Sequence, residues 1–172
     1  ATAQDNHIDG GYDAHGLVET VVSGALRNRV SDRLGAYINA ANTSAQSIAT
    51  GASFVTVSSW TSTSNRAPYV SGNGSWTPSA GRWRITATVG FAGSTGGTKR
   101  QARLLAGGAT VLDQAQISNP SAATTETMKL QANYLFDGAT SLVLQVAQDS
   151  GGALALVGTA GFVTLNAERV GA

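Results

Sequence analysis

The sequence predicts an all-β fold, a β-sandwich of the jelly-roll type, preceded by a short N-terminal arm and one amphipathic helix. Three observations predict it. From Ala36 onward apolar and polar residues tend to alternate, which is the period of a half-buried strand. Turn residues separate about eight such segments. Gly accounts for 21 of 172 residues and charged residues for only 12%, about half the usual charged fraction of a soluble domain.

Residues 1–35 differ in character from the rest and are expected to form a separate anchoring segment. Residues 1–15 lack periodicity and contain Gly10 and Gly11, which predicts an arm. Residues 16–35 predict a helix of about five turns. Its apolar stripe consists of Leu17, Val18, Val21, Val22, Ala25, Leu26, Val30 and Leu34. A lone helix of this length is marginal in water, so it needs a partner.

The first half of the β-domain, predicted over residues 36–172, contains one long strand. Residues 54–60 are rich in strand-forming residues, and residues 61–81 are expected to be loops around a short strand near Tyr69. Strict alternation then predicts a strand over 83–91 with one buried face. That face consists of Trp83, Ile85, Ala87, Val89 and Phe91.

The second half predicts further strands separated by turns. Arg100–Leu105 and Thr110–Ile117 flank Gly107–Gly108, which predicts a hairpin. Alternation predicts strands at 128–136 and 142–146 on either side of Asp137–Gly138, and a last strand pair between about Ala153 and Val170. This number of strands is typical of a sandwich or jelly roll.

Composition excludes several classes of function. A net charge of +1 gives no field that would recruit nucleic acid or an anionic membrane. The absence of Cys excludes a disulfide framework and a thiolate metal site. The longest purely apolar run, Ala153 to Val157, is far too short to span a membrane. Asp5, Asp9 and Asp13 have the wrong charge for a secretory signal, so we expect a mature chain without one.

The arm carries the residues that most resemble metal ligands, namely Asp5, His7, Asp9, Asp13 and His15. An EF-hand loop would need Asp or Asn where His7 stands and Glu where Gly16 stands. A zinc site is the lesser alternative, because Gly10–Gly11 favours an extended polar arm. We therefore expect no metal and no cofactor.

The β-domain offers no recognisable catalytic set. Both histidines lie in the arm, so a Ser-His-acid triad within the domain is not expected. The domain's acidic residues fall mostly at expected strand ends or turns, and nothing singles out a pair for glycoside hydrolysis. They are Asp113, Glu126, Asp137, Asp149 and Glu168. The protein is expected not to be an enzyme.

Two features are candidates for surface contacts. Lys99, Arg100 and Arg103 form a basic cluster, which either protects a strand edge, the favoured interpretation, or contacts an acidic shell or a glycan. Trp76 lies in a Gly/Ser-rich stretch and is either a plug under a loop or an exposed ring that stacks on a sugar or a partner.

Several segments together resemble one family. Gly81–Phe91 resembles the glycine, aromatic and alternating strand of the C1q/TNF-like jelly roll. Residues 134–139 followed by Leu142–Val146 resemble that family's strand pair, and Gln148–Gly152 and Phe162–Leu165 resemble its closing positions. Lys99–Arg103 before a Gly-Gly hairpin resembles the versions of this domain in tailed-phage virion proteins. The resemblance covers residues 36–172.

The resemblance implies a non-enzymatic homotrimer with aromatic and aliphatic side chains along the three-fold axis. In phages such domains serve as head-decoration, head-fibre or tail-tip modules joined to an N-terminal anchor. This chain has no collagen repeat, cysteine or export signal, which favours the viral version over a secreted one. We therefore expect a phage structural protein on the virion, on the capsid surface rather than the tail.

The expected partners follow from this interpretation. They are further copies of the chain and the major capsid protein or another virion protein, with no nucleic acid and no membrane. The residues expected to attach the chain to the virion are Ile8, Tyr12, Leu17, Val18, Val21, Val22 and Leu26. The alternative is a tail-tip or fibre module that recognises a host surface glycan through loops 61–80 and 93–98.

Overall fold

The computed structural model describes residues 37–65, 74–94, 96–118, 125–159 and 161–171. The chain divides into two units, residues 1–36 and 37–172. The predicted arm, the predicted helix and the predicted strand near Tyr69 lie outside the described residues. None of the described residues belongs to a helix long and apolar enough to cross a membrane.

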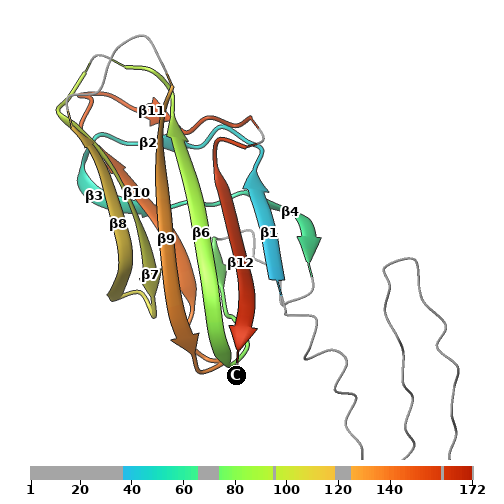
Figure 1. Ribbon diagram of the computed structural model, residues 1–172. Coiled ribbons are helices and arrows are strands. Elements are labelled where there is room, and N and C mark those ends of the chain that lie inside the picture. The colour runs from blue at the N-terminus through green and yellow to red at the C-terminus, as the bar shows by residue number, and fades with distance from the viewer. Residues whose placement is uncertain (1–36, 66–73, 95, 119–124, 160, 172) are drawn as a thin grey trace, which may run out of the picture. The chain divides into compact units, whose positions relative to one another are not determined.

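The described residues form twelve strands, which confirms the all-β prediction (Figure 1). The strands are β1 (Tyr37–Asn42), β2 (Ser47–Ile48), β3 (Gly51–Thr56), β4 (Trp60–Asn65), β5 (Ser75–Trp76), β6 (Gly81–Phe91), β7 (Lys99–Ala106), β8 (Thr110–Ser118), β9 (Glu126–Phe136), β10 (Leu142–Gln148), β11 (Leu154–Ala155) and β12 (Thr164–Gly171).

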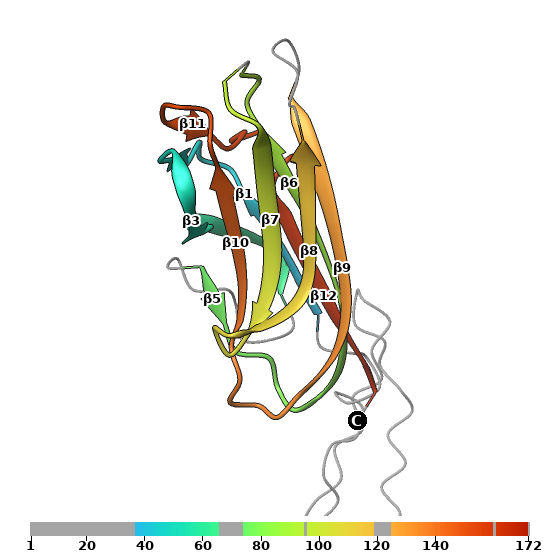
Figure 2. The same ribbon diagram turned by 90° about the vertical axis from the view of Figure 1, so that its left-hand side faces the viewer.

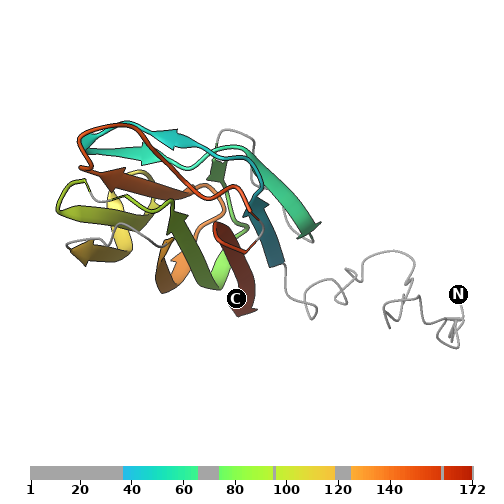
Figure 3. The ribbon, with the colours of Figure 1, turned by 90° about the horizontal axis from the view of Figure 1, so that it is seen from above.

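Two antiparallel sheets form the layers of the sandwich. One has the strand order β4-β1-β12-β6-β9, which we call the front sheet because it faces the viewer in Figure 1. The other has the order β3-β10-β7-β8 with β5 paired to β10, and we call it the back sheet. Figure 2 shows β10, β7 and β8 in front of β6 and β12, and Figure 3 shows the layers from above. The short strands β2 and β11 pair with each other.

The core lies between the two sheets, where β6 supplies the predicted face. Trp83, Ile85 and Phe91 are fully buried, as are Ala87 and Val89 in the same phase, while Arg84 and Thr86 on the other face are exposed. Leu104 and Leu144 face them from β7 and β10 of the back sheet. The ring of Trp76 on β5 meets that of Trp83 edge-on, with centroids 5.0 Å apart. Each large apolar side chain buried in this way contributes roughly 1.5–3 kcal/mol.

Two expectations about individual strands are wrong. Residues 61–81 contain most of β4 and all of β5 besides loops. Residues 54–60, predicted to be rich in strand-forming residues, span the end of β3 and the start of β4, which belong to different sheets, and Ser59 between them has a positive φ of 61°. The last two strands do not pair with each other: β11 pairs with β2, and β12 lies between β1 and β6.

The strand directions give the sandwich two distinct ends. Tyr37, the first described residue, pairs with Glu168 near the end of β12, so the chain enters and leaves at the same end. Figure 1 shows the C-terminus at this lower end, and β2 and β11 at the other. Two surfaces of interest follow from this layout: the outward face of the front sheet and the loop end.

Candidate functional site

The outward face of the front sheet carries two rows of polar residues in register. In the first row Tyr37 pairs with Glu168, and Glu168 pairs with Arg84. The second row runs across β1, β12, β6 and β9 and consists of Asn39, Asn166, Thr86 and Gln131. These residues and Ala167 line a hollow of about 480 Å³. Period-two alternation puts the second row there, because each of its four residues lies next to a buried residue of its own strand.

The charged groups of this hollow neutralise each other. The guanidinium of Arg84 forms an ion pair with the carboxylate of Glu168 across the neighbouring strands β6 and β12. The two side chains are 56% and 44% exposed, so solvent screens the pair and its own contribution to stability is small. The other polar lining groups are amides and hydroxyls. The hollow therefore offers hydrogen-bonding groups without a net charge.

An apolar groove adjoins the hollow at the end where the chain leaves. It has a volume of about 410 Å³ and is lined by Ala80, Gly81, Leu135, Phe136, Asp137 and Arg169. Leu135 pairs with Arg82, one row beyond the Arg84 row. The side chains of Leu135 and Val170 are 61% and 51% exposed. Exposed apolar residues gathered beside a groove are typical of a contact surface.

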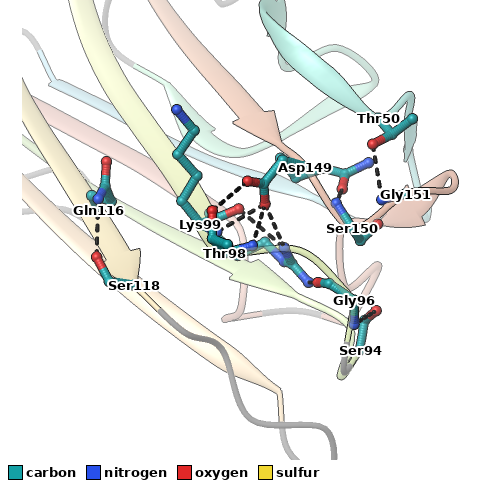
Figure 4. A network of polar contacts seen from close by, with 12 residues as sticks. Thr50, Ser94, Gly96, Thr98, Lys99, Gln116, Ser118, Asp149, Ser150 and Gly151 are labelled. Atoms are coloured by element: carbon teal, nitrogen blue, oxygen red, sulfur yellow. Dashed lines mark hydrogen bonds and ion pairs between the residues drawn. The ribbon is translucent and has the colours of Figure 1, made fainter.

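The loop end of the sandwich is held by a network around Asp149 (Figure 4). Its carboxylate accepts hydrogen bonds from the backbone N–H groups of Thr98 and Lys99, each at 2.8 Å, and from the Thr98 hydroxyl at 2.7 Å. The Lys99 N–H, followed by the Thr98 hydroxyl, holds the pKa of Asp149 below its usual value. The network thereby ties the β6–β7 loop to the end of β10.

Arg100 completes this network from within. Its guanidinium donates to the carbonyls of Lys99 and Gly96 at 3.0 and 2.9 Å and lies 3.6 Å from Asp149. The side chain is only 1% exposed. Because its polar partners are internal loop groups, Arg100 shapes the loops and presents no charge to a partner.

The surface-contact prediction is wrong for Arg100 and Trp76, which are both almost fully buried. Arg100 lies in phase with Ala102 and Leu104, so the alternation of β7 turns it inward. Trp76 plugs the core against Trp83, which was the other interpretation considered for it. Lys99 remains half-buried at the start of β7.

Arg103 lies apart from the hollow, on the outward face of the back sheet. Its guanidinium stacks 3.8 Å above the ring of Phe54 and donates twice to the Gln145 side-chain oxygen, at 3.0 and 2.8 Å. The three predicted basic residues therefore do not form one patch. The seven predicted attachment residues all lie outside the described part of the chain.

The described residues contain no group of three or more His, Cys, Asp or Glu side chains that could hold a metal ion. Both histidines lie outside them. The residues of the hollow were not singled out by sequence reasoning, because Asn, Gln and Thr at outward positions resemble an ordinary solvated face. The available signal was their matching position on four neighbouring strands, which requires the pairing register.

Comparison with solved structures identifies the fold. The TNF domain of Eiger from S. frugiperda superposes with a TM-score of 0.60 at 10% identity, covering 80% of this chain and 92% of that one. Murine APRIL at pH 5.0 gives 0.59 at 12% identity, covering 79% and 99%. The globular domain of zebrafish complement 1qA gives 0.57 at 10% identity, covering 78% and 97%. No protein-family model and no curated protein matches the chain.

The protein therefore has a C1q/TNF-like jelly-roll fold, as the sequence resemblance predicted. At identities this low the likeness defines the architecture alone. What the molecule does must be argued from its own surfaces.

Proposed function

We propose that the protein is a non-enzymatic structural component of a phage virion, a homotrimeric capsid-decoration or head-fibre-type protein anchored through residues 1–35. The observation that carries the self-association is the apolar groove beside Leu135, on a fold of the C1q/TNF-like type. The phage setting rests on the sequence resemblance around Lys99–Arg103. The capsid surface is proposed over the tail because the anchoring segment is too short for a long fibre.

The proposed contact between copies uses the groove end of the front sheet. Leu135 and Val170 are two of the three large hydrophobic side chains that are exposed among the described residues, and both lie at this end. Burying apolar surface gains roughly 25 cal/mol per Å², so a second copy covering both side chains is favoured. A closed ring of three copies buries the groove on each one.

The proposed anchoring gains strength from multivalency. Three N-terminal segments on one trimer bind a shell far more tightly than a single segment, because later contacts form at high effective concentration. A trimer also matches a three-fold position on a capsid without any symmetry mismatch. The major capsid protein or another virion protein is the proposed partner, through the apolar positions Ile8 to Leu26.

Charge introduction at Leu135 tests the self-association. Light scattering of the full chain is expected to give the mass of three copies, and Leu135→Lys is expected to give a single copy. Val111→Lys is the matched control, because Val111 is 47% exposed on β8 of the back sheet, away from the groove. A monomeric wild type, or an unchanged mass for Leu135→Lys, would refute the proposed contact.

The alternative remains a tail-tip or fibre module that recognises a host glycan through loops 61–80 and 93–98. Trp76, the ring in these loops that was considered for stacking on a sugar, is buried and does not face a ligand. Other side chains of the two loops would have to supply the contacts with the glycan instead. We therefore favour the structural role over glycan recognition.

A further inference from the structure

We propose that Arg103, on the outward face of the back sheet, is the centre of a binding site for the carboxylate of an acidic saccharide. Arg103 lies on β7, between β10 and β8, the strands that Figure 2 shows at the front. The groove beside Leu135 belongs to the other sheet. Binding at Arg103 therefore does not compete with the proposed contact between copies and does not rest on it.

The guanidinium of Arg103 is held in one orientation by uncharged groups. Its central carbon lies 3.8 Å from the centre of the Phe54 ring. Its Nε and Nη2 atoms both donate to the side-chain oxygen of Gln145, at 3.0 and 2.8 Å. The Gln145 amide nitrogen in turn lies 3.5 Å from the Thr56 hydroxyl. A guanidinium fixed in this way loses little side-chain freedom when it binds a ligand.

A fork of N–H groups on Arg103 has no partner among the described residues. A guanidinium presents five N–H groups, and two of those on Arg103 bind Gln145. The N–H groups that remain, on Nη1 and Nη2, are parallel and match the two oxygens of a carboxylate. Hydrogen bonds between charged groups are roughly twice as strong as those between neutral groups. The fork is therefore a ready site for a carboxylate.

The charge around Arg103 also favours an anion. The strands β3, β5, β7, β8 and β10 contain a single acidic residue, Asp113. Its carboxylate faces β9, where it accepts a backbone hydrogen bond at 2.7 Å. The residues that pair with Arg103, Gln114 on β8 and Gln145 on β10, are uncharged. No carboxylate among the described residues therefore neutralises Arg103, and Lys99 adds a second positive charge to the same face.

The neighbouring side chains favour a saccharide over an acidic peptide. Exposed Gln114 lies opposite Arg103, and in the next row Gln101 donates to the side-chain oxygen of Gln116 at 2.9 Å. Amides combine donors with an acceptor, which suits the hydroxyl groups of a sugar. An extended peptide would instead need free backbone groups at a strand edge. The strand β7 offers none there, because it is paired with β10 on one side and β8 on the other.

NMR titration of the isotope-labelled full chain tests the site with two pairs of ligands, sialyllactose with lactose and cellobiouronic acid with cellobiose. At least one acidic member is expected to bind in the millimolar range, and its neutral partner about tenfold more weakly, because the charged hydrogen bonds are missing. The proposal is overturned if neither acidic saccharide binds, or if the neutral partner binds as tightly. Equally tight binding of N-acetylglutamate amide would show that a peptide carboxylate suffices and would also overturn it.

Substitutions at Arg103 separate the fork from the charge. Arg103→Gln is expected to weaken binding of the acidic saccharide at least about tenfold. Arg103→Lys keeps the charge without the fork and is expected to recover only part of this loss. Lys99→Gln is the matched control. It removes an equal charge from the same face about 13 Å away along β7, beyond the screening length of about 8 Å in physiological salt.

A variant beside Arg103 keeps the test independent of any effect on folding. Gln114→Ala changes an exposed side chain and is expected to weaken binding severalfold while the thermal midpoint stays unchanged. Light scattering is expected to give the wild-type copy number for every variant, because the groove beside Leu135 is untouched. Unchanged affinity in both Arg103→Gln and Gln114→Ala, full affinity in Arg103→Lys, or an equal loss in Lys99→Gln overturns the proposal.

Discussion

At the scale of single residues, Trp83 and Trp76, whose rings meet edge-on in the core, have different hydrogen bonding. The indole N–H of Trp83 donates to the Ser79 carbonyl at 2.8 Å. The indole N–H of Trp76 is buried and has no hydrogen-bond partner among the described residues. A buried donor without an acceptor is a cost that folding must offset. The same substitution should therefore have unequal effects at the two positions.

We expect Trp83→Phe to lower the free energy of unfolding by about 1 kcal/mol more than Trp76→Phe does. Both changes remove ring volume from the core. Trp83→Phe also leaves the Ser79 carbonyl without its donor, whereas Trp76→Phe removes an N–H group that has no acceptor. Urea unfolding followed by circular dichroism measures both losses. Equal losses, or a larger loss for Trp76→Phe, would contradict the assigned hydrogen bonding.

At the scale of elements, long strands were predictable and short ones were not. The strands β6 and β9 each run for eleven residues, so alternation over their length was visible in the sequence. The strands β2, β5 and β11 have two residues each, too few to show a period. The pairing of the strands could not be predicted either. The partners of β12 are β1 and β6, which are distant in sequence, so no local pattern indicates them.

The Asp149 network joins two elements and should make the fold sensitive to acid. The carboxylate's pKa is lowered in the folded chain by the Lys99 N–H and the Thr98 hydroxyl. A lowered folded pKa means that the stabilisation is present above the unfolded pKa of about 3.9 and is lost as pH falls through the folded value. Protonation removes the charge that these donors favour and that lies beside buried Arg100.

We therefore expect Asp149→Asn to lower the urea midpoint at neutral pH and to flatten its decline between about pH 5 and pH 2. Thr98→Val retains both backbone N–H donors to Asp149 but loses the hydroxyl donor. The decline of its urea midpoint with falling pH should therefore be less steep than in the wild type and steeper than in Asp149→Asn. The urea midpoint, measured across this range for all three chains, checks the prediction. An acid slope in Asp149→Asn as steep as in the wild type would show that another group controls the transition.

At the scale of the whole molecule, the sequence predicted the architecture better than the surfaces. Alternation and the family resemblance led to the jelly roll, because both depend on apolar positions that repeat along each strand. The hollow depends on Asn39 and Gln131, which lie far apart in sequence and meet only through the register of four strands. Chemistry of this kind has no local pattern, so it became visible only in the folded sheet.

The division of the chain at Tyr37 leads to the last prediction. Every buried apolar residue of the described core lies between Ala40 and Ala167, so a fragment of residues 37–172 has the whole of that core. We expect the fragment to keep the mass of three copies and the thermal midpoint of the full chain. We also expect it to lose incorporation into virions, because the proposed anchor is missing. Light scattering measures the copy number of the fragment, and virion sedimentation measures its incorporation. A monomeric fragment would show that self-association depends on residues 1–36. A fragment that still sediments with virions would refute the proposal that residues 1–35 anchor the chain.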